Sequence, residues 1–377
     1  MARTNVKAKP KTDLVALLGD LVKFPTLTTQ HATSQAAFDW IKAQLEGLPL
    51  HFYDSVSQGV PSLVITTQQT KHPKVLLMAH IDVAPAAVEA FELRREHGRL
   101  YGRGVFDMKF AVAAYVKLLL ELGEDAAKYD VGVMLTADEE TGGHNGTGYL
   151  VEQGWRTDVA INPDAIGSGG WDLEEVAKGV GRVRVESHGA AGHGSRPWLY
   201  RNAISQLTKF LADLERHFPT EPCGDPEHFH STLSIGTIEG GAALNQIPDF
   251  AQAELDIRTV PGTSAMAVEQ LLRQTAQRYD GLTLIFEVLP QPFTVDRENE
   301  YVRLAELILT KVTGKQPAFI VSHGGTDSRY FAELKTPHIL TSPPGGGAHA
   351  DDEWLDERGL EQFYKFVHDF VLQVAKK

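Results

Sequence analysis

Residues 75–82 of the chain read VLLMAHID, an apolar run that ends in a histidine and an aspartate. A short continuous apolar run of this kind is typical of a buried strand in a parallel sheet. Ligands of open α/β sheets bind just beyond the carboxyl ends of such strands. His80 and Asp82 are two residues apart, so their side chains point to the same side of the strand end. By itself the motif is better explained by a polar, solvated strand end, and only the further motifs of the chain favour a ligand site.

The composition describes an ordinary globular protein that is too long for a single core. The chain has 377 residues, of which 42% are hydrophobic and 23% charged, and this length favours two domains. No apolar stretch of 18 residues is present, so no membrane span is predicted. The formal net charge of -13 argues against a general nucleic-acid-binding surface.

Two features of the sequence bear on its location. Cys223 is the single cysteine and has no internal disulfide partner, which fits a reducing cytoplasm. Its neighbours Pro222 and Gly224 favour a loop over a nucleophilic site. Residues 1–12 are basic but lack the apolar core of a secretory signal, so we expect a frayed tail there.

The order of predicted elements indicates one domain inserted into another. Strands and helices alternate up to about residue 179, which predicts an α/β sheet. Between residues 180 and 289 the order is β-α-β-β-α-β, the ferredoxin-like pattern. Beyond Pro290 and Pro292 a helix, a strand, a glycine-rich loop and a final helix follow. We therefore expect a mixed-sheet α/β domain from residues 1–179 and 290–377, with an inserted α+β domain at 180–289.

Further histidines and carboxylates follow other predicted elements. Each has an ordinary explanation when taken singly, such as a helix N-cap at Asp107 or a solvated acidic turn at 138–140. The set comprises His80, Asp107, Glu140, Asp164 and His349. Two histidines with three carboxylates suit borderline divalent metals, zinc foremost, although cobalt or manganese fits as well. Asp107 could bridge two ions about 3.5–4 Å apart, and the neighbouring Glu139 would then be free to act as general base.

Several motifs together give the chain a family resemblance. They are the His80-x-Asp82 pair, GRGVFDMK at 102–109, DEETGG at 138–143, NPD at 162–164 and His349 before DEW at 352–354. With them, nearly the whole chain resembles the di-zinc metallopeptidase and amidohydrolase family of succinyl-diaminopimelate desuccinylase, acetylornithine deacetylase, aminoacylase and glutamate carboxypeptidase. The resemblance implies a di-zinc catalytic domain and an inserted lid and dimerisation domain at 180–289.

The resemblance also implies roles for the residues of the larger domain. His80 and Asp164 would bind one zinc, Glu140 and His349 the other, and Asp107 would bridge the two ions. Asp82 would orient His80, and Glu139 would take a proton from water and pass it to the leaving amine. A cis peptide is expected at Asp107-Met108.

In the inserted domain the resemblance singles out a second group of residues. His193 aligns with a histidine that polarises the scissile carbonyl and that, in dimeric relatives, reaches the other subunit's site; a homodimer is therefore implied. Asn245 and Arg258 align with residues that recognise the substrate carboxylate, while Gly325 and Thr326 would line the pocket. From the residues alone, a solvated loop histidine and an ion pair between Arg258 and Asp256 explain two of these positions as well.

The predicted function is metal-dependent hydrolysis of an amide or peptide bond in a small substrate with a free carboxylate, as in dipeptidases and carboxypeptidases. Neither nucleic acid nor membrane is expected as a partner, given the net charge and the lack of a long apolar stretch. The alternative within enzymes is an N-acyl-amino-acid deacylase of the deacetylase or desuccinylase type. A non-catalytic binding protein on the same fold is the third interpretation, and it would require the loss of a ligand or of Glu139, none of which is missing.

Overall fold

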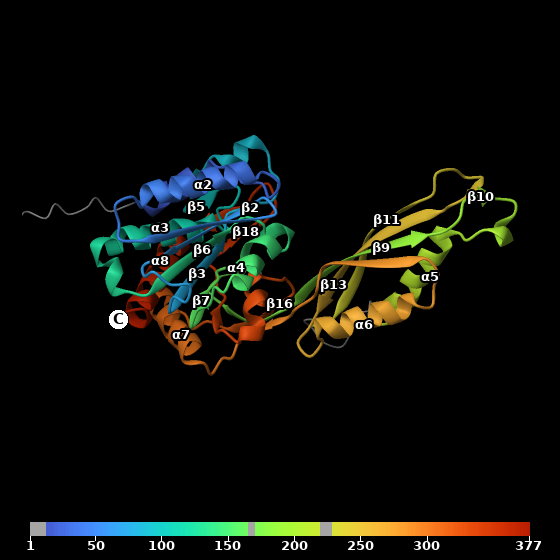
Figure 1. Ribbon diagram of the computed structural model, residues 1–377. Helices are drawn as coiled ribbons and strands as arrows, with labels where there is room; N and C mark the ends of the chain where they lie inside the picture. The colour runs from blue at the N-terminus through green and yellow to red at the C-terminus, as the bar shows by residue number, and fades with distance from the viewer. Residues whose placement is uncertain (1–12, 165–169, 219–227) are drawn as a thin grey trace, which may run out of the picture. The chain divides into compact units, whose positions relative to one another are not determined.

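The computed structural model of the protein describes residues 13–164, 170–218 and 228–377 (Figure 1). The expected tail at residues 1–12 and the expected loop around Cys223 lie outside these residues. The chain forms two compact units. Unit 1 comprises Met1–Glu174, Asp296–Phe319 and Lys335–Lys377, and unit 2 comprises Glu175–Val295 and Ile320–Leu334.

Unit 1 contains six helices and two sheets among its described residues. The helices are α1 (Leu14–Val22), α2 (His31–Gln44), α3 (Lys109–Leu122), α4 (Tyr149–Glu152), α7 (Glu300–Thr313) and α8 (Glu357–Val374). The strands of the larger sheet are β1 (His51–Ser57), β2 (Val60–Thr66), β3 (Val75–His80), β6 (Val131–Thr136), β7 (Val159–Ile161) and β17 (His338–Ile339). The smaller sheet contains β4 (Arg94–Glu96), β5 (Arg99–Tyr101), β18 (Gly345–Gly346) and β19 (Trp354–Asp356).

The larger sheet of unit 1 is mixed, with the predicted apolar strand near its centre. Its order is β1-β2-β6-β3-β7-β17. Strand β3 pairs in parallel with β6 and β7, whereas β1 and β2 join antiparallel at one side. All six residues of β3 are buried, because helices and neighbouring strands cover both faces of a central parallel strand. The predicted mixed α/β sheet is therefore confirmed.

Helix α3 begins directly after Asp107-Met108 and is almost entirely apolar. Residues 109–119 are all buried, which is the pattern of a helix enclosed in a core. Helix α3 packs on β3 and beside α1 and α8. The rings of Phe110 and Phe363 meet edge to face, with centroids 4.9 Å apart. This packing holds the N-terminal end of α3, and hence Asp107, against the end of β3.

Unit 2 has the ferredoxin-like order that the sequence predicts. Its main elements are β9 (Gly179–His188), α5 (Ala203–Glu215), β11 (Thr232–Gly240), β13 (Phe250–Thr259), α6 (Ala265–Ala276) and β14 (Leu282–Val288). The antiparallel sheet has the order β11-β13-β9-β14. Alternate strand residues such as Val183, Val185, Ala253 and Leu255 form its core with apolar residues of α5 and α6, as expected for a sheet with one covered face.

Short elements complete the described chain. Strands β10 (Gly192–His193) and β12 (Gln246–Ile247) form a two-stranded ribbon, and β15 (Phe293–Thr294), β8 (Leu173–Ala177) and β16 (Phe319–Ser322) form a sheet in that order. Within the described ranges, no helix is both long and apolar enough to cross a membrane.

Candidate metal centre and active site

Three parallel strands deliver the candidate residues of unit 1 to one edge of the sheet. His80 is the last residue of β3, the acidic turn at 138–140 follows β6, and Asp164 follows β7. Because β6, β3 and β7 are adjacent and parallel, their carboxyl ends lie side by side. The sequence placed these residues at successive strand ends, and parallel pairing is the reason that they meet.

The side chains gather in two neighbouring groups that could each hold a metal ion. His80, Glu139 and Asp164 form one group, and Asp107, Glu140 and His349 form the other. In each group, one ligand atom per residue lies within 4.8 Å of the others. The five predicted ligands are all present, and Glu139, for which we predicted proton transfer, stands beside them.

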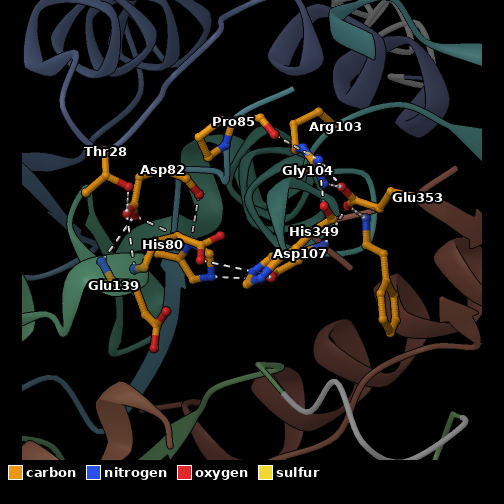
Figure 2. A network of polar contacts seen from close by, with 12 residues as sticks. Thr28, His80, Asp82, Pro85, Arg103, Gly104, Asp107, Glu139, His349 and Glu353 are labelled. Atoms are coloured by element: carbon orange, nitrogen blue, oxygen red, sulfur yellow. Dashed lines mark hydrogen bonds and ion pairs between the residues drawn. The ribbon is translucent and has the colours of Figure 1, made fainter. Parts of the chain in front are cut away.

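The carboxylate of Asp107 lies between the two histidines and connects the groups (Figure 2). Its Oδ1 is 3.0 Å from Nε2 of His80, and its Oδ2 is 3.1 Å from Nε2 of His349. The ordinary explanation of Asp107 as a helix N-cap is wrong, because Met108 occupies that position and Asp107 makes no capping hydrogen bond. The Asp107-Met108 peptide is cis, as expected from the family resemblance.

Hydrogen bonding around these residues fits a cation. Nδ1 of His80 lies 2.9 Å from the carbonyl oxygen of Asp82; a carbonyl only accepts, so Nδ1 donates and Nε2 faces Asp107. Nε2 of His349 faces both Asp107 and, at 3.0 Å, Glu140 Oε2. Oε1 of Glu140 is buried and accepts no hydrogen bond from the described residues. Such convergence of buried acceptors requires positive charge between them.

The pKa values in the centre respond to the same crowding. Burial by itself would raise the pKa of Asp107, yet the hydrogen bonds from His349 and His80 hold that pKa well below its usual range. The hydrogen bond to Asp107 raises the pKa of His349 to about 9. Burial raises the pKa of Glu140, and the negative charge of Asp107 adds to that effect. The carboxylates thus repel one another and attract any cation that enters.

Asp82 has a different set of contacts from the expected one. Its main-chain carbonyl accepts the hydrogen bond from His80, while its carboxylate is 3.5 Å from that ring. The carboxylate oxygens instead accept the main-chain N–H groups of Glu139 and Glu140, both at 3.2 Å, and the hydroxyl of Thr28 at 3.0 Å. Asp82 therefore holds the acidic turn as well as the ring.

Asp138 supports the other side of the same turn. Its Oδ2 accepts the N–H groups of Asn145 and Gly146 at 2.8 and 3.1 Å. A Cβ at Gly146 would lie 2.2 Å from Asp138 Oδ1, so only glycine fits. Sequence reasoning assigned Asp138 no role, although the glycines that follow it at 142, 143 and 146 were a signal of a tightly folded loop.

The predicted residues of unit 2 lie in two places at opposite ends of its sheet. His193 is in the β10–β12 ribbon, where the N–H of Gly194 donates to the carbonyl of Asn245 at 2.8 Å. Arg258 is in β13 opposite Val180 at the start of β9. Its Nε and Nη2 donate to Oδ1 and Oδ2 of Asp256 at 2.6 and 2.9 Å. This ion pair is the ordinary explanation of Arg258 that the sequence also offered.

Gly325 and Thr326 accompany Arg258 at its end of the sheet. A Cβ at Gly325 would lie 2.2 Å from Cγ2 of Val180, so the loop passes close to the start of β9. Thr326 is buried. The structure thus groups Arg258 with the 324–326 loop, and His193 with Asn245.

Comparison with known proteins agrees with this arrangement. Residues 76–373 match the model of peptidase family M20/M25/M40. Succinyl-diaminopimelate desuccinylase of Wolinella succinogenes is 28% identical over 356 residues, which cover 91% of this chain and 94% of that protein. A probable carboxypeptidase of Paracoccidioides brasiliensis is 32% identical over 223 residues, 55% of this chain and 50% of that protein. The M20 family metallo-carboxypeptidase Sso-CP2 of Sulfolobus solfataricus superposes with a TM-score of 0.75 at 18% identity, covering 95% and 98% of the two chains.

A metal-dependent hydrolase is the class of protein that this fold and site define. The chain belongs to peptidase family M20/M25/M40, since the family model matches most of its length. The predicted hydrolase function and the family resemblance are thereby confirmed, and the interpretation as a non-catalytic binding protein loses its basis.

The contacts of Asp82 generate a prediction about stability. Asp82→Asn leaves one acceptor oxygen, so an NH2 group faces a main-chain N–H whichever way the amide is turned. We expect the free energy of unfolding to fall by roughly 1–3 kcal/mol, measured by urea titration in the presence of a chelator. Thr28→Val, which removes only the hydroxyl donor, should cost about 1 kcal/mol. An unchanged unfolding midpoint in Asp82→Asn would show that the carboxylate does not hold the turn.

Proposed function

We propose that the enzyme hydrolyses an amide or peptide bond in a small substrate with a free carboxylate, in the manner of a dipeptidase or carboxypeptidase. The observation that carries the proposal is the pair of His/carboxylate groups joined through Asp107. Two-metal hydrolases use this arrangement, with a carboxylate shared between the two ions.

In this proposal five residues bind two zinc ions, which cobalt or manganese could replace. His80 and Asp164 would hold one ion and Glu140 and His349 the other, and Asp107 would contribute to both. Imidazole and carboxylate donors suit these metals. When bound, the ions would polarise the scissile carbonyl and lower the pKa of water at the site.

Glu139 is proposed as the general base and acid. Its carboxylate belongs to the group with His80 and Asp164, and its N–H is held by Asp82. From that position it would accept a proton from the attacking water and return the proton to the leaving amine. The hydrogen bond from the N–H of Glu139 to Asp82 fixes the main chain at Glu139. This limits the motion of the carboxylate between accepting the proton and returning it.

Substrate recognition is proposed for residues of unit 2. Arg258 has the planar fork that binds a carboxylate through two parallel hydrogen bonds, and it already makes such a pair with Asp256. A substrate carboxylate would therefore compete with Asp256 for the guanidinium. Asn245 would assist in carboxylate binding, Gly325 and Thr326 would line the pocket, and His193 would polarise the scissile carbonyl.

The separation of these residues within unit 2 favours a homodimer. Strand β13 runs from Phe250, near the His193 ribbon, to Arg258. Eight residue steps of a strand span about 26 Å, so His193 and Arg258 of one chain are too far apart to contact one small substrate. We propose that His193 acts in the site of a second copy of the chain.

The surface of unit 2 offers a place for that second copy. Strand β11 is at the edge of its sheet and has no further strand partner among the described residues, and such edges pair readily with another strand. Trp198, Leu199 and Leu244 are also exposed near His193, with 77%, 59% and 107% relative accessibility. Large exposed apolar side chains of this kind mark protein contacts.

Light scattering combined with activity tests the dimer proposal. We expect a species of twice the 41.4 kDa chain mass. Mixing inactive His193→Ala with inactive Glu139→Ala should restore part of the activity, because one of the two sites in a mixed dimer receives both intact residues. A fully active monomer would contradict the proposal.

Glu139→Ala tests the proposed chemistry. We expect kcat to fall by roughly 10²–10⁴-fold, the usual contribution of general acid–base catalysis, while two metal ions per chain are retained in elemental analysis. Glu124→Ala, which changes an exposed carboxylate outside the centre, serves as the matched control. Unchanged turnover of Glu139→Ala at full metal content would exclude the general-base role.

A deacylase is the second candidate function, and the similarity to a desuccinylase over 91% of the chain favours it. A panel of dipeptides and N-acetyl and N-succinyl amino acids, assayed on one metal-loaded preparation, separates the candidates. We expect kcat/KM to be at least ten times higher for the best dipeptide. A higher value for an acylated amino acid would replace the peptidase proposal with the deacylase.

We also propose a cytoplasmic location, which the single cysteine of the sequence supports. Cell fractionation that places the protein in a secreted fraction would contradict it.

A further inference from the structure

A fully buried ion pair lies beside the candidate metal centre and is part of neither group of candidate ligands. Nη1 of Arg103 is 2.9 Å from Oε2 of Glu353, and both side chains are only 2% exposed. Burying two charges is costly, and further hydrogen bonds compensate for part of that cost. The positions of those further bonds indicate what the pair does.

The carboxylate of Glu353 binds the main chain that leads into Asp107. Oε2 accepts the N–H of Gly104 at 2.9 Å, and Oε1 accepts the N–H groups of Phe106 and Asp107 at 2.8 and 3.0 Å. Gly104 has a φ of 83°, which glycine adopts without strain. Glu353 thus fixes three peptide units of an irregular loop, the last of which belongs to the bridging residue itself.

The guanidinium of Arg103 binds the main chain of the other candidate ligand. Nη2 donates to the carbonyl oxygens of His349 and Pro85, both at 3.1 Å (Figure 2). His349 has a φ of 64°, an unusual conformation for a residue with a Cβ. Its side chain is 54% exposed, so packing alone does little to fix the ring. The contact from Arg103 fixes the peptide that carries it.

The ion pair therefore connects the main-chain segments that carry the two candidate ligands. Asp107 and His349 are 242 residues apart in sequence, and neither lies within a helix or strand. Glu353 fixes the main chain at Asp107, and Arg103 fixes the main chain at His349. The ion pair between Glu353 and Arg103 links these two contacts. Because a metal site needs ligand atoms within a few tenths of an ångström of their positions, the distance between these peptides bears directly on metal affinity.

We propose that Arg103 and Glu353 are positioning residues that set the spacing of Asp107 and His349 and so tune the affinity of the centre for its metal. The inference rests on the proposed metal-binding role of those two ligands. An ion pair that served only the fold would stabilise the protein with or without metal. A positioning pair has a larger effect on metal binding than on the stability of the metal-free chain.

Two variants separate these possibilities. Arg103→Lys keeps the charge near Glu353 but removes the fork that reaches His349 and Pro85. Glu353→Gln keeps the shape but loses the charge and one of the two acceptor oxygens. Arg95→Lys is the matched control, because Arg95 forms a two-pronged but exposed pair with Glu357 in the same part of unit 1.

The measurement is the dissociation constant for Zn²⁺ by competition with a chromophoric chelator, together with the urea unfolding midpoint of the chelated protein. We expect Arg103→Lys and Glu353→Gln each to weaken zinc binding by roughly 10–100-fold, the effect of losing a group that orients metal ligands. Arg95→Lys should change the constant less than twofold. Combining Arg103→Lys with Glu353→Gln should add little to either alone, since both act through one pair.

Asp107→Asn distinguishes failure of this inference from failure of the proposed function. If Asp107→Asn keeps both metals, the proposed centre itself is wrong. If Asp107→Asn loses metal while Arg103→Lys and Glu353→Gln lower only the unfolding midpoint, the centre stands and the pair serves the fold alone. Failure of both pair variants to fold, with Asp107→Asn folded, would overturn the positioning role in the same way.

Discussion

The carboxylate of Asp107, buried between the imidazoles of His80 and His349, is the constraint around which unit 1 is arranged. A buried carboxylate is tolerated only when positive charge or hydrogen bonds compensate for lost water. Here one oxygen faces each ring, so strand β3 must end at this point and the 347–353 loop must pass through it. Helix α3 starts two residues after Asp107 and is buried over residues 109–119. Its packing holds Asp107 in place.

Three other buried acids stabilise irregular loops that carry the candidate site residues. Asp82 accepts main-chain N–H groups at 139 and 140, Asp138 at 145 and 146, and Glu353 at 104, 106 and 107. Hydrogen bonds from N–H to an ionised carboxylate are stronger than those between neutral groups. Such acids can therefore fix loops that have no helix or strand ladder of their own, and Asp107, Glu139 and Glu140 lie on loops held in this way.

Much of this arrangement follows from local sequence. The apolar run that begins at residue 75 was predicted as a buried strand, and residues 75–80 form one. Since parallel strands end at one edge, His80 and Glu140 could be expected to approach each other. By contrast, the ion pair of Arg103 with Glu353 joins positions 250 residues apart, and no periodicity links two loops. The main-chain contacts of Asp82 were missed for the same reason.

The kinds of groups available and their order follow from the amino-acid sequence: strand ends with histidines and carboxylates, a glycine-rich turn after 138–140, and an inserted β-α-β-β-α-β unit. These features depend on side-chain type and on spacings of two to four residues, which the chain encodes locally. Folding of the whole chain places Asp107 between His80 and His349, lets Asp82 hold the acidic turn, and puts His193 and Arg258 at opposite ends of one sheet. Those relations depend on strand register and on packing between distant segments, and both are settled only when the whole chain folds.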